Sequence, residues 1–205
     1  MGKKTFWDRI AFAYDTAESL NKKVYKAMLS RIVSLVPDNA KVLECAAGTG
    51  AISIAAALKA KSVLCTDLSI PMLEQARRKA EKMGLKNITF AERNIFALPE
   101  NDNSFDAVIA ANVIHLLENP YDALAELWRV TKSGGALIVP TFLTRGSGNG
   151  FRFIIKLYKI IGFQPAHNFS ETQYREMLLG SGLPMPDIHV IQGKIPCGFA
   201  VFQKI

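Results

Sequence analysis

The residues best placed to do chemistry form a loop of small residues between two acids. The apolar pair 42–43 runs into Glu44 and then into Cys45-Ala46-Ala47-Gly48-Thr49-Gly50, and a second apolar run, 62–66, ends at Asp67. A loop with almost no side chain lets a ligand lie against backbone amides. A carboxylate after the following strand can accept hydrogen bonds from both hydroxyls of a ribose. The pattern therefore predicts a nucleoside site.

Spacing alone leaves three nucleoside cofactors open, namely NAD, FAD and S-adenosylmethionine (SAM). It also leaves open a tight strand-to-helix turn without a ligand. The dinucleotide fingerprint G-x-G-x-x-G would need glycine at position 53, and the chain has Ser53. None of the five tyrosines is followed four residues later by lysine, as a short-chain dehydrogenase would require. Both observations argue against a nicotinamide oxidoreductase.

Four segments, this loop and three further ones taken in order, carry a resemblance. They are Glu44 to Gly50, then Thr66-Asp67-Leu68-Ser69 with Met72-Leu73, then Ser104-Phe105-Asp106-Ala107-Val108-Ile109, and then Arg129-Val130-Thr131-Lys132-Ser133-Gly134-Gly135. This series resembles the motifs of class I SAM-dependent methyltransferases. The likeness runs from about Tyr14 to the C-terminus, and it is closest to the branch with quinone-biosynthesis C-methyltransferases and many small-molecule methyltransferases.

The resemblance implies SAM as the cofactor and a set of residues around it. Those residues are Tyr14, Glu44, Ala46, Ala47, Gly48, Thr49, Gly50, Asp67, Leu68, Met72, Asn94, Ile95, Ala111 and Asn112. Two of them depart from the family pattern. Ala46 stands where glycine is common, which matters only if that residue needs a positive φ. Asn94 stands where aspartate is common, and its carbonyl oxygen can still accept a hydrogen bond from the adenine amino group.

The implied chemistry is displacement at an already activated methyl group, so the protein's main work is alignment, exclusion of water and removal of a proton. His115 is the candidate base, because it follows the fourth strand and an unperturbed imidazole titrates near pH 6.5. The alternative is a histidine that only packs or bonds a loop carbonyl. His167 and His189 are weaker candidates, although His167 could reach the pocket. We expect Glu44 to position the cofactor rather than to catalyse.

Helices and strands alternate along the chain. The expected helices are 20–36, 51–60, 69–83, 119–132 and 171–180, and the expected strands begin at 41 and 62 and cover 87–91, 104–111, 135–142, 187–191 and 198–203. This order predicts an α/β fold: one doubly wound, Rossmann-like, mostly parallel seven-stranded sheet with helices on both faces. The last two strands are close in sequence and must pair antiparallel. The ligand crevice is expected at the carboxyl ends of the strands.

Two segments are expected to shape the acceptor pocket. Residues 1–36 are interpreted as N-terminal lid helices by resemblance, or as an ordinary aromatic helix face containing Trp7. Residues 144–168 are interpreted as a cap insertion after strand five, with a glycine-rich hinge and a run, 151–163, that places basic residues on one helical face. We expect this cap to close over an apolar or aromatic substrate. The competing idea is a membrane-surface helix that reaches a lipid-like acceptor.

Composition sets the remaining expectations. The chain has 205 residues, 49% of them hydrophobic, and is interpreted as a single methyltransferase domain spanning 1–205. The net charge of +7 is scattered, so we do not expect nucleic acid as a partner. An RNA or protein methyltransferase is the alternative, without the Asn-Pro-Pro-Tyr-like motif of amino-group methylases at 112–115. Ribose or ring-carbon methylation stays open.

Three cysteines without metal-binding spacing suggest buried reduced thiols and no metal site. No signal peptide or long apolar run is visible, so we expect a cytoplasmic protein with no stable membrane insertion, a monomer or a homodimer, acting on a small molecule.

Overall fold

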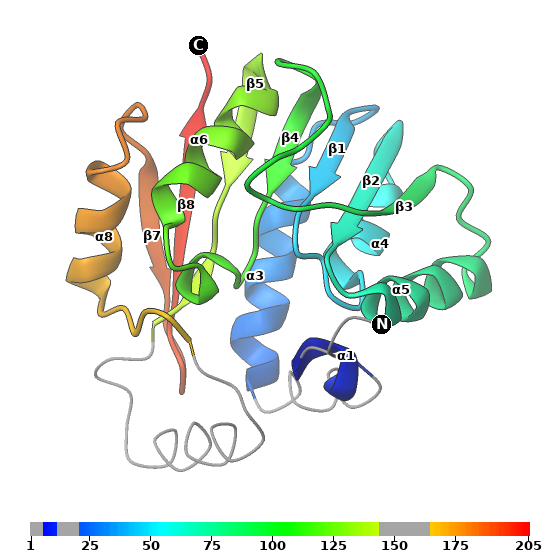
Figure 1. The fold of residues 1–205 in the computed structure, drawn as a ribbon, viewed down its shortest axis with the longest axis horizontal. Helices are drawn as coiled ribbons and strands as arrows, with labels where there is room; N and C mark the ends of the chain where they lie inside the picture. The colour runs from blue at the N-terminus through cyan, green and yellow to red at the C-terminus, as the bar shows by residue number, and fades with distance from the viewer. Residues whose placement is uncertain (1–5, 12–20, 144–164) are drawn as a thin grey trace.

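The computed structural model of the protein describes residues 6–11, 21–143 and 165–205. Within these residues eight strands form one sheet in the order β3-β2-β1-β4-β5-β8-β6, with β7 paired to β8 (Figure 1). The strands are β1 Lys41–Glu44, β2 Ser62–Asp67, β3 Ile88–Glu92, β4 Phe105–Ile109, β5 Thr131–Ile138, β6 Thr141–Phe142, β7 Asp187–Ile191 and β8 Cys197–Gln203. Strands β1 to β5 are parallel, and β8 is antiparallel to β5, β6 and β7. The predicted Rossmann-like fold is confirmed.

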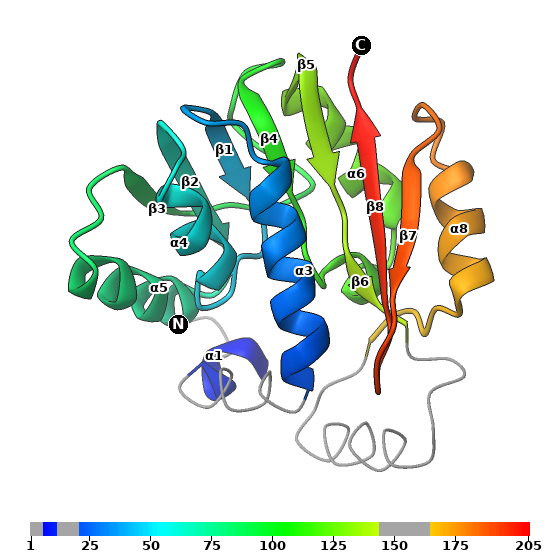
Figure 2. The same ribbon diagram turned by 180° about the vertical axis from the view of Figure 1, so that it is seen from behind.

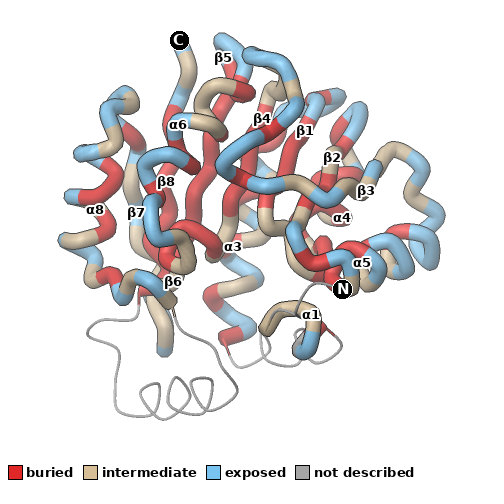
Figure 3. Tube along the Cα trace, viewed as in Figure 1, coloured by how far each residue is buried: buried red, intermediate tan, exposed pale blue. Residues whose placement is uncertain are grey.

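Helices cover both faces of this sheet (Figures 1 and 2). They are α1 Phe6–Ile10, α3 Lys22–Leu35, α4 Ala51–Ala57, α5 Ile70–Lys82, the 3-10 turn η2 Ile114–Leu116, α6 Pro120–Val130 and α8 Glu171–Leu179. Side chains alternate along each strand, so neighbouring residues enter opposite cores. Val42 packs with α3 and α4 on one face, whereas Leu43 packs with α6 and α8 on the other. Figure 3 shows the resulting band of buried residues through the centre of the sheet.

The helix starts follow the local sequence. Ser69 caps α5 by accepting from the Met72 amide, and Asn119 caps α6 with Pro120 directly behind it. The capping box predicted at Ser170 is present, with reciprocal bonds to Gln173. These caps fix where each helix begins relative to the strand that precedes it.

The fifth strand differs from its prediction at both ends. Helix α6 ends at Val130, and β5 already begins at Thr131 rather than at Gly135. The strand then stops at Ile138 and resumes as the two-residue β6, with Pro140 between the two pieces. The Pro140 carbonyl accepts from the Asn112 amide, so the amide hydrogen that proline lacks would have faced the side of β4. Both pieces pair with β8, so the sheet has eight strands rather than the seven predicted.

Most of the predicted cap lies outside the described residues, which omit 144–164. Of the predicted lid, residues 1–5 and 12–20 are omitted, and α1 and the whole of α3 are described. No helix in the described ranges is both long and apolar enough to cross a bilayer.

Candidate functional site

The carboxyl ends of β1, β2 and β4 meet around the loop that joins β1 to α4. In this loop Ala46, Gly48 and Gly50 have φ values of 53°, 55° and 76°. Ala46 therefore does occupy the left-handed region, the condition under which its methyl group matters. The three left-handed residues coil the chain tightly between strand and helix. The loop is held by its own amides, since those of Ala47 and Gly50 donate to the carbonyls of Thr66 and Ala47.

Asp67, at the end of β2, fastens this loop. One carboxylate oxygen accepts from the Gly48 amide at 2.8 Å, and the other accepts from the Ser69 amide at 2.8 Å. Burial raises the pKa of Asp67 above its ordinary value, and the two amide bonds oppose that shift. The carboxylate thus holds the loop and faces the cavity with its remaining hydrogen-bonding capacity.

Glu44, at the end of β1, is almost fully buried with 2% of its surface exposed. It accepts a hydrogen bond of 2.5 Å from the Ser53 hydroxyl. Ser53 itself is fully buried, at the position where a dinucleotide fingerprint would have glycine. The residue that argues against a dinucleotide site is therefore the partner that orients the Glu44 carboxylate.

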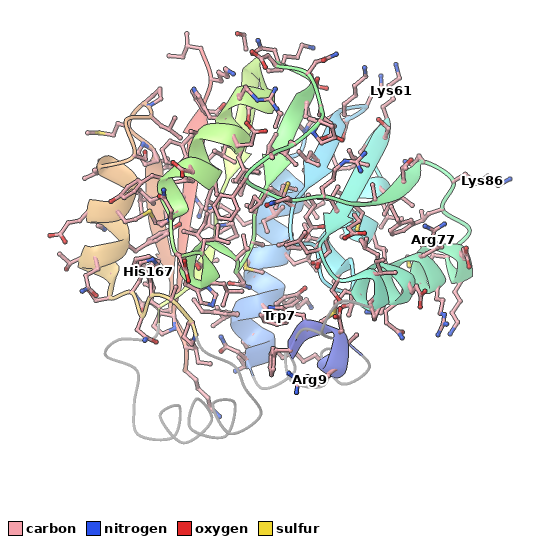
Figure 4. The ribbon with its side chains drawn as sticks, viewed as in Figure 1. Trp7, Arg9, Lys61, Arg77, Lys86 and His167 are labelled. Atoms are coloured by element: carbon pink, nitrogen blue, oxygen red, sulfur yellow. The ribbon has the colours of Figure 1, made fainter. Side chains whose placement is uncertain are left out.

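Two adjoining cavities lie at these strand ends. The larger, about 240 Å³, is lined by Trp7, Ala46, Gly48, Asp67, Leu68, Met72, Arg93, Ile95, Phe96, Ala111, Asn112, Val113, Leu116 and Leu117. The smaller is lined by Tyr25, Glu44, Ala46, Ala47, Gly48, Thr49, Ala51, Ile52, Ala111 and Asn112. Four residues belong to both linings, so the cavities form one elongated site with an acid in each half. Figure 4 shows Trp7 reaching this region from α1.

Most of the residues predicted to bind the cofactor line one of these cavities. The three that do not are Tyr14, Gly50 and Asn94. Tyr14 lies outside the described residues. Gly50 instead packs on α5, where an added Cβ would come within 2.5 Å of the Ala76 Cβ. Asn94 is exposed and its side-chain oxygen accepts from the Phe96 amide at 3.0 Å, so its neighbours Arg93 and Ile95 form the wall instead.

Asn112 carries an unusual combination of features. Its φ is 54°, and its side-chain nitrogen donates to the Met28 sulfur at 3.9 Å. Its side-chain oxygen is buried and has no hydrogen-bond partner among the described residues. A buried acceptor without a donor costs about 1–3 kcal/mol. A ligand that donates a hydrogen bond here would remove that cost.

His115 lies in η2, between the cavity-lining residues Val113 and Leu116, but is absent from both linings. Its Nδ1 is 2.9 Å from the Thr141 hydroxyl, and both residues are buried. Burial, and secondarily the nearby His167, lowers the pKa of His115 to about 4. Burial thus takes the pKa of this imidazole away from the unperturbed value near 6.5, and the group is neutral at pH 7.

The other two histidines lie apart from the cavity linings. The His167 amide donates to the His115 carbonyl at 2.9 Å, and its ring stacks on Phe169 at 5.3 Å. The His167 Nε2 is buried without a hydrogen-bond partner among the described residues. His189 is on β7, where its exposed ring lies 2.9 Å from Asp187. The structure therefore pairs His167 with His115 and separates His189 from the site.

Sequence reasoning missed several wall residues, namely Arg93, Phe96, Val113, Leu116 and Leu117. Each flanks a motif residue that was predicted, so the signal lay in adjacency alone. Trp7 and Tyr25 were considered only as parts of a lid or an aromatic face. Their place in the wall depends on how α1 and α3 approach the strand ends, which local pattern does not specify.

The three cysteines, Cys45, Cys65 and Cys197, are buried free thiols, as predicted. Burial raises the pKa of Cys45 and of Cys197 to about 12, and raises that of Cys65 further. They are inert at neutral pH. In the described ranges no three histidine, cysteine or acidic side chains gather as metal ligands would.

Comparison with known proteins adds independent information. Residues 43–139 match the family model described as a methyltransferase domain. The chain is 32% identical over 153 residues to the ubiquinone/menaquinone biosynthesis C-methyltransferase of Zymomonas mobilis, covering 73% of this chain and 63% of that protein. It is 33% identical over 142 residues to the demethylmenaquinone methyltransferase of Clavibacter sepedonicus, covering 67% of this chain and 57% of the relative.

A solved structure from Thermotoga maritima, described as a SAM-dependent methyltransferase and possible histamine N-methyltransferase, superposes with a TM-score of 0.75 at 20% identity. The superposition covers 98% of this chain and 99% of that one. This likeness concerns the fold alone. The chain spans about three fifths of the length of the curated relatives it matches, 63% and 57% for the two above.

Proposed function

Because the chain belongs to the class I SAM-dependent methyltransferases, we propose that it transfers the methyl group of SAM to a small apolar or aromatic molecule. The observation that carries the proposal is the elongated site at the carboxyl ends of β1, β2 and β4, with one carboxylate in each half. Bound SAM supplies an electrophilic methyl group that is ready for displacement. The protein has to bind it, orient it and exclude water.

The residues around the site fit this cofactor. Asp67 retains acceptor capacity for the two ribose hydroxyls, and Glu44 lies in the other half, where a cationic amino group gains from a nearby carboxylate. Leu68, Met72 and Ile95 offer an apolar slot for the adenine ring. The unpartnered oxygen of Asn112 is a further acceptor in the wall that the two halves share.

We propose an aromatic ring of the quinol type as the acceptor class. Two curated relatives act in quinone biosynthesis by name, and the rim of the larger cavity supports an apolar acceptor with Phe96, Leu116 and Leu117. An electron-rich ring of this kind attacks through carbon, and the ring carbon then gives up its proton.

His115 stays our candidate for accepting that proton. Its imidazole is neutral at pH 7 because its pKa is about 4, so it is free to bind a proton but is a weak base. The acceptor would have to approach from the side of Thr141 and His167 to reach it.

Thermal-shift titration with SAM, its demethylated product and NAD tests the cofactor first. A ligand at 100 times its dissociation constant adds about 2.7 kcal/mol, several degrees for a chain of this size. Asp67→Asn should remove most of the shift with SAM, since the amide lacks the second acceptor oxygen. Asp106→Asn, at the opposite end of the sheet, is the matched control and should keep it. A shift with NAD alone would overturn the proposal.

Transfer of labelled methyl groups to short-chain demethylated hydroquinones tests the acceptor. Incorporation at ring carbon supports the quinol class. Binding of SAM without transfer to any member of the panel would leave the cofactor assignment standing and reject this acceptor.

A further inference from the structure

The first turn of α3 carries exposed lysines where a helix favours acidic residues. Lys22, Lys23 and Lys26 are all exposed, and the first turn contains no acid. The positive end of the helix dipole makes lysine unfavourable at this position. Asn21 does not compensate, because its side chain makes no capping bond and instead donates to the Ile195 carbonyl at 2.9 Å. The charge of this turn is therefore not explained by helix stability.

The bond from Asn21 brings a fourth lysine to the same place. It ties the start of α3 to the tip of the hairpin between β7 and β8, where Gly193 packs so closely that an added Cβ would fall 2.1 Å from the Val24 side chain. Lys194, at this tip, is exposed. On α1, Arg9 is exposed as well (Figure 4). We call Arg9, Lys22, Lys23, Lys26 and Lys194 the basic face.

Little negative charge opposes this basic face. Within segments 6–11, 21–26 and 192–196 the only acid is Asp8, which accepts a hydrogen bond of 2.6 Å from the Ser69 hydroxyl. None of the four lysines forms an ion pair with another residue in the described part of the chain. Their charge is available to an external partner.

The basic face borders the opening of the elongated site. Tyr25, on the same turn as the lysines, lines the smaller cavity, and Trp7, two residues before Arg9, lines the larger one. Two further wall residues of the larger cavity are apolar yet exposed, Leu68 at 61% and Phe96 at 41%. Positive charge and exposed apolar side chains thus surround one opening.

We propose that the basic face docks this opening against an anionic phospholipid surface. Lysine ammonium groups act as point charges that suit a diffuse layer of acidic headgroups, whereas arginine is the residue favoured for recognising individual nucleic-acid phosphates. Four of the five members of the basic face are lysines. The exposed apolar rim would meet the lipid interface, and an apolar molecule held in the bilayer could enter the site without crossing water.

Co-sedimentation of the full chain with vesicles tests this docking. Vesicles of phosphatidylcholine alone are compared with vesicles that also contain phosphatidylglycerol, at low and high salt. We expect binding only to the anionic vesicles, weakened by salt. The double variant Lys22→Glu/Lys26→Glu should bind them about tenfold more weakly or worse. Lys22→Glu puts an acid in the first turn of α3, which favours the helix, whereas Lys26 lies one turn further on at an exposed position. An unchanged circular dichroism spectrum and an unchanged thermal midpoint show that a loss of binding does not come from unfolding.

The matched control is Lys61→Glu/Lys86→Glu, which removes the same charge from exposed positions on other edges of the molecule (Figure 4). It should bind anionic vesicles nearly as well as the natural chain. An equal loss in both variants would mean that net charge, not the basic face, drives binding, and would overturn the proposal. So would a natural chain that ignores anionic vesicles, or one that binds a single-stranded oligonucleotide more tightly than vesicles at the same salt.

Discussion

Two residues beside the elongated site, Ala46 and Asn112, lie in the left-handed region, with φ of 53° and 54°. Asparagine tolerates this conformation, whereas alanine disfavours it. Both line both cavities, at the carboxyl ends of β1 and β4. Strain of this kind costs about 1–2 kcal/mol for a residue with a Cβ. It persists because the surrounding strands fix the chain on either side.

We expect Ala46→Gly to raise the free energy of unfolding by up to about 1 kcal/mol. Relief of the left-handed strain outweighs the extra entropy that glycine gives the unfolded chain, about 0.4–1 kcal/mol. Urea unfolding measures the change. Ala47→Gly is the control, because Ala47 has no positive φ, and should lose stability instead. A loss of similar size in both variants would refute the strain at Ala46.

His115 should make stability fall in mild acid. Its folded pKa, about 4, lies below the ordinary value of 6.5, so between these values the unfolded chain binds a proton that the folded chain excludes. The full stability is present above pH 6.5, and about 3 kcal/mol is lost as the pH falls to 4. His115→Gln should lack this part of the acid sensitivity in urea unfolding at both pH values. His189→Gln, on the exposed strand β7, should keep it.

Among the elements, the start of α4 packs closely on α5 beside the site. Gly50, with φ of 76°, lies against Ala76 and Cys65. This contact fixes α4 beside β2 and so sets the distance from the loop amides to Asp67. The contact between α4 and α5 leaves no room for a side chain at position 50.

We expect Gly50→Ala to cost about 3 kcal/mol or more, since backbone strain adds to overpacking. Gly84→Ala separates the two effects. Gly84 has φ of 69° but nothing within 4 Å of an added Cβ, so only strain of about 1 kcal/mol should remain. Denaturant unfolding of both variants measures the difference. Equal losses of stability in the two variants would show that α4 and α5 can move apart enough to admit a methyl group.

The predictable part of the elements was the part encoded locally. The side chains of Ser69, Asn119 and Ser170 predicted three helix starts. Asp67 was predicted at the end of β2 beside the loop, but its hydrogen bond to the Gly48 amide was not. Alternation of apolar runs gave the sheet class. The break near Pro140 needed knowledge of the neighbouring strands, because the side of the chain on which proline lacks its hydrogen is known only from the fold. That side faces β4, where the Pro140 carbonyl accepts from Asn112, while pairing with β8 continues in both pieces. Likewise, the low pKa of His115 follows from burial by elements distant in sequence.

Across the whole molecule, the three buried thiols lie at three different strands of the sheet. Cys45 follows β1, Cys65 lies in β2, and Cys197 begins β8. They belong to three different apolar clusters, so each reports whether its own part of the core has opened.

We expect none of the three thiols to react with a thiol reagent in the native protein at pH 8, and all three to react after unfolding. High pKa values and burial both suppress the thiolate. If the sheet opens as one unit, labelling in mild denaturant should show one rate for all three. Mass spectrometry of the labelled peptides measures it. Earlier labelling of Cys197 would show that the antiparallel strands open independently.

The position of β8 has a consequence for how the protein is made. This strand follows β6 and β7 along the chain, yet it lies between β5 and β7 and also pairs with β6. During synthesis, β1 to β5 can assemble as soon as they leave the ribosome, whereas β6 and β7 lack their partner strand until β8 emerges. One side of β5 stays an open edge for that interval, the kind of surface to which chaperones and neighbouring nascent chains bind.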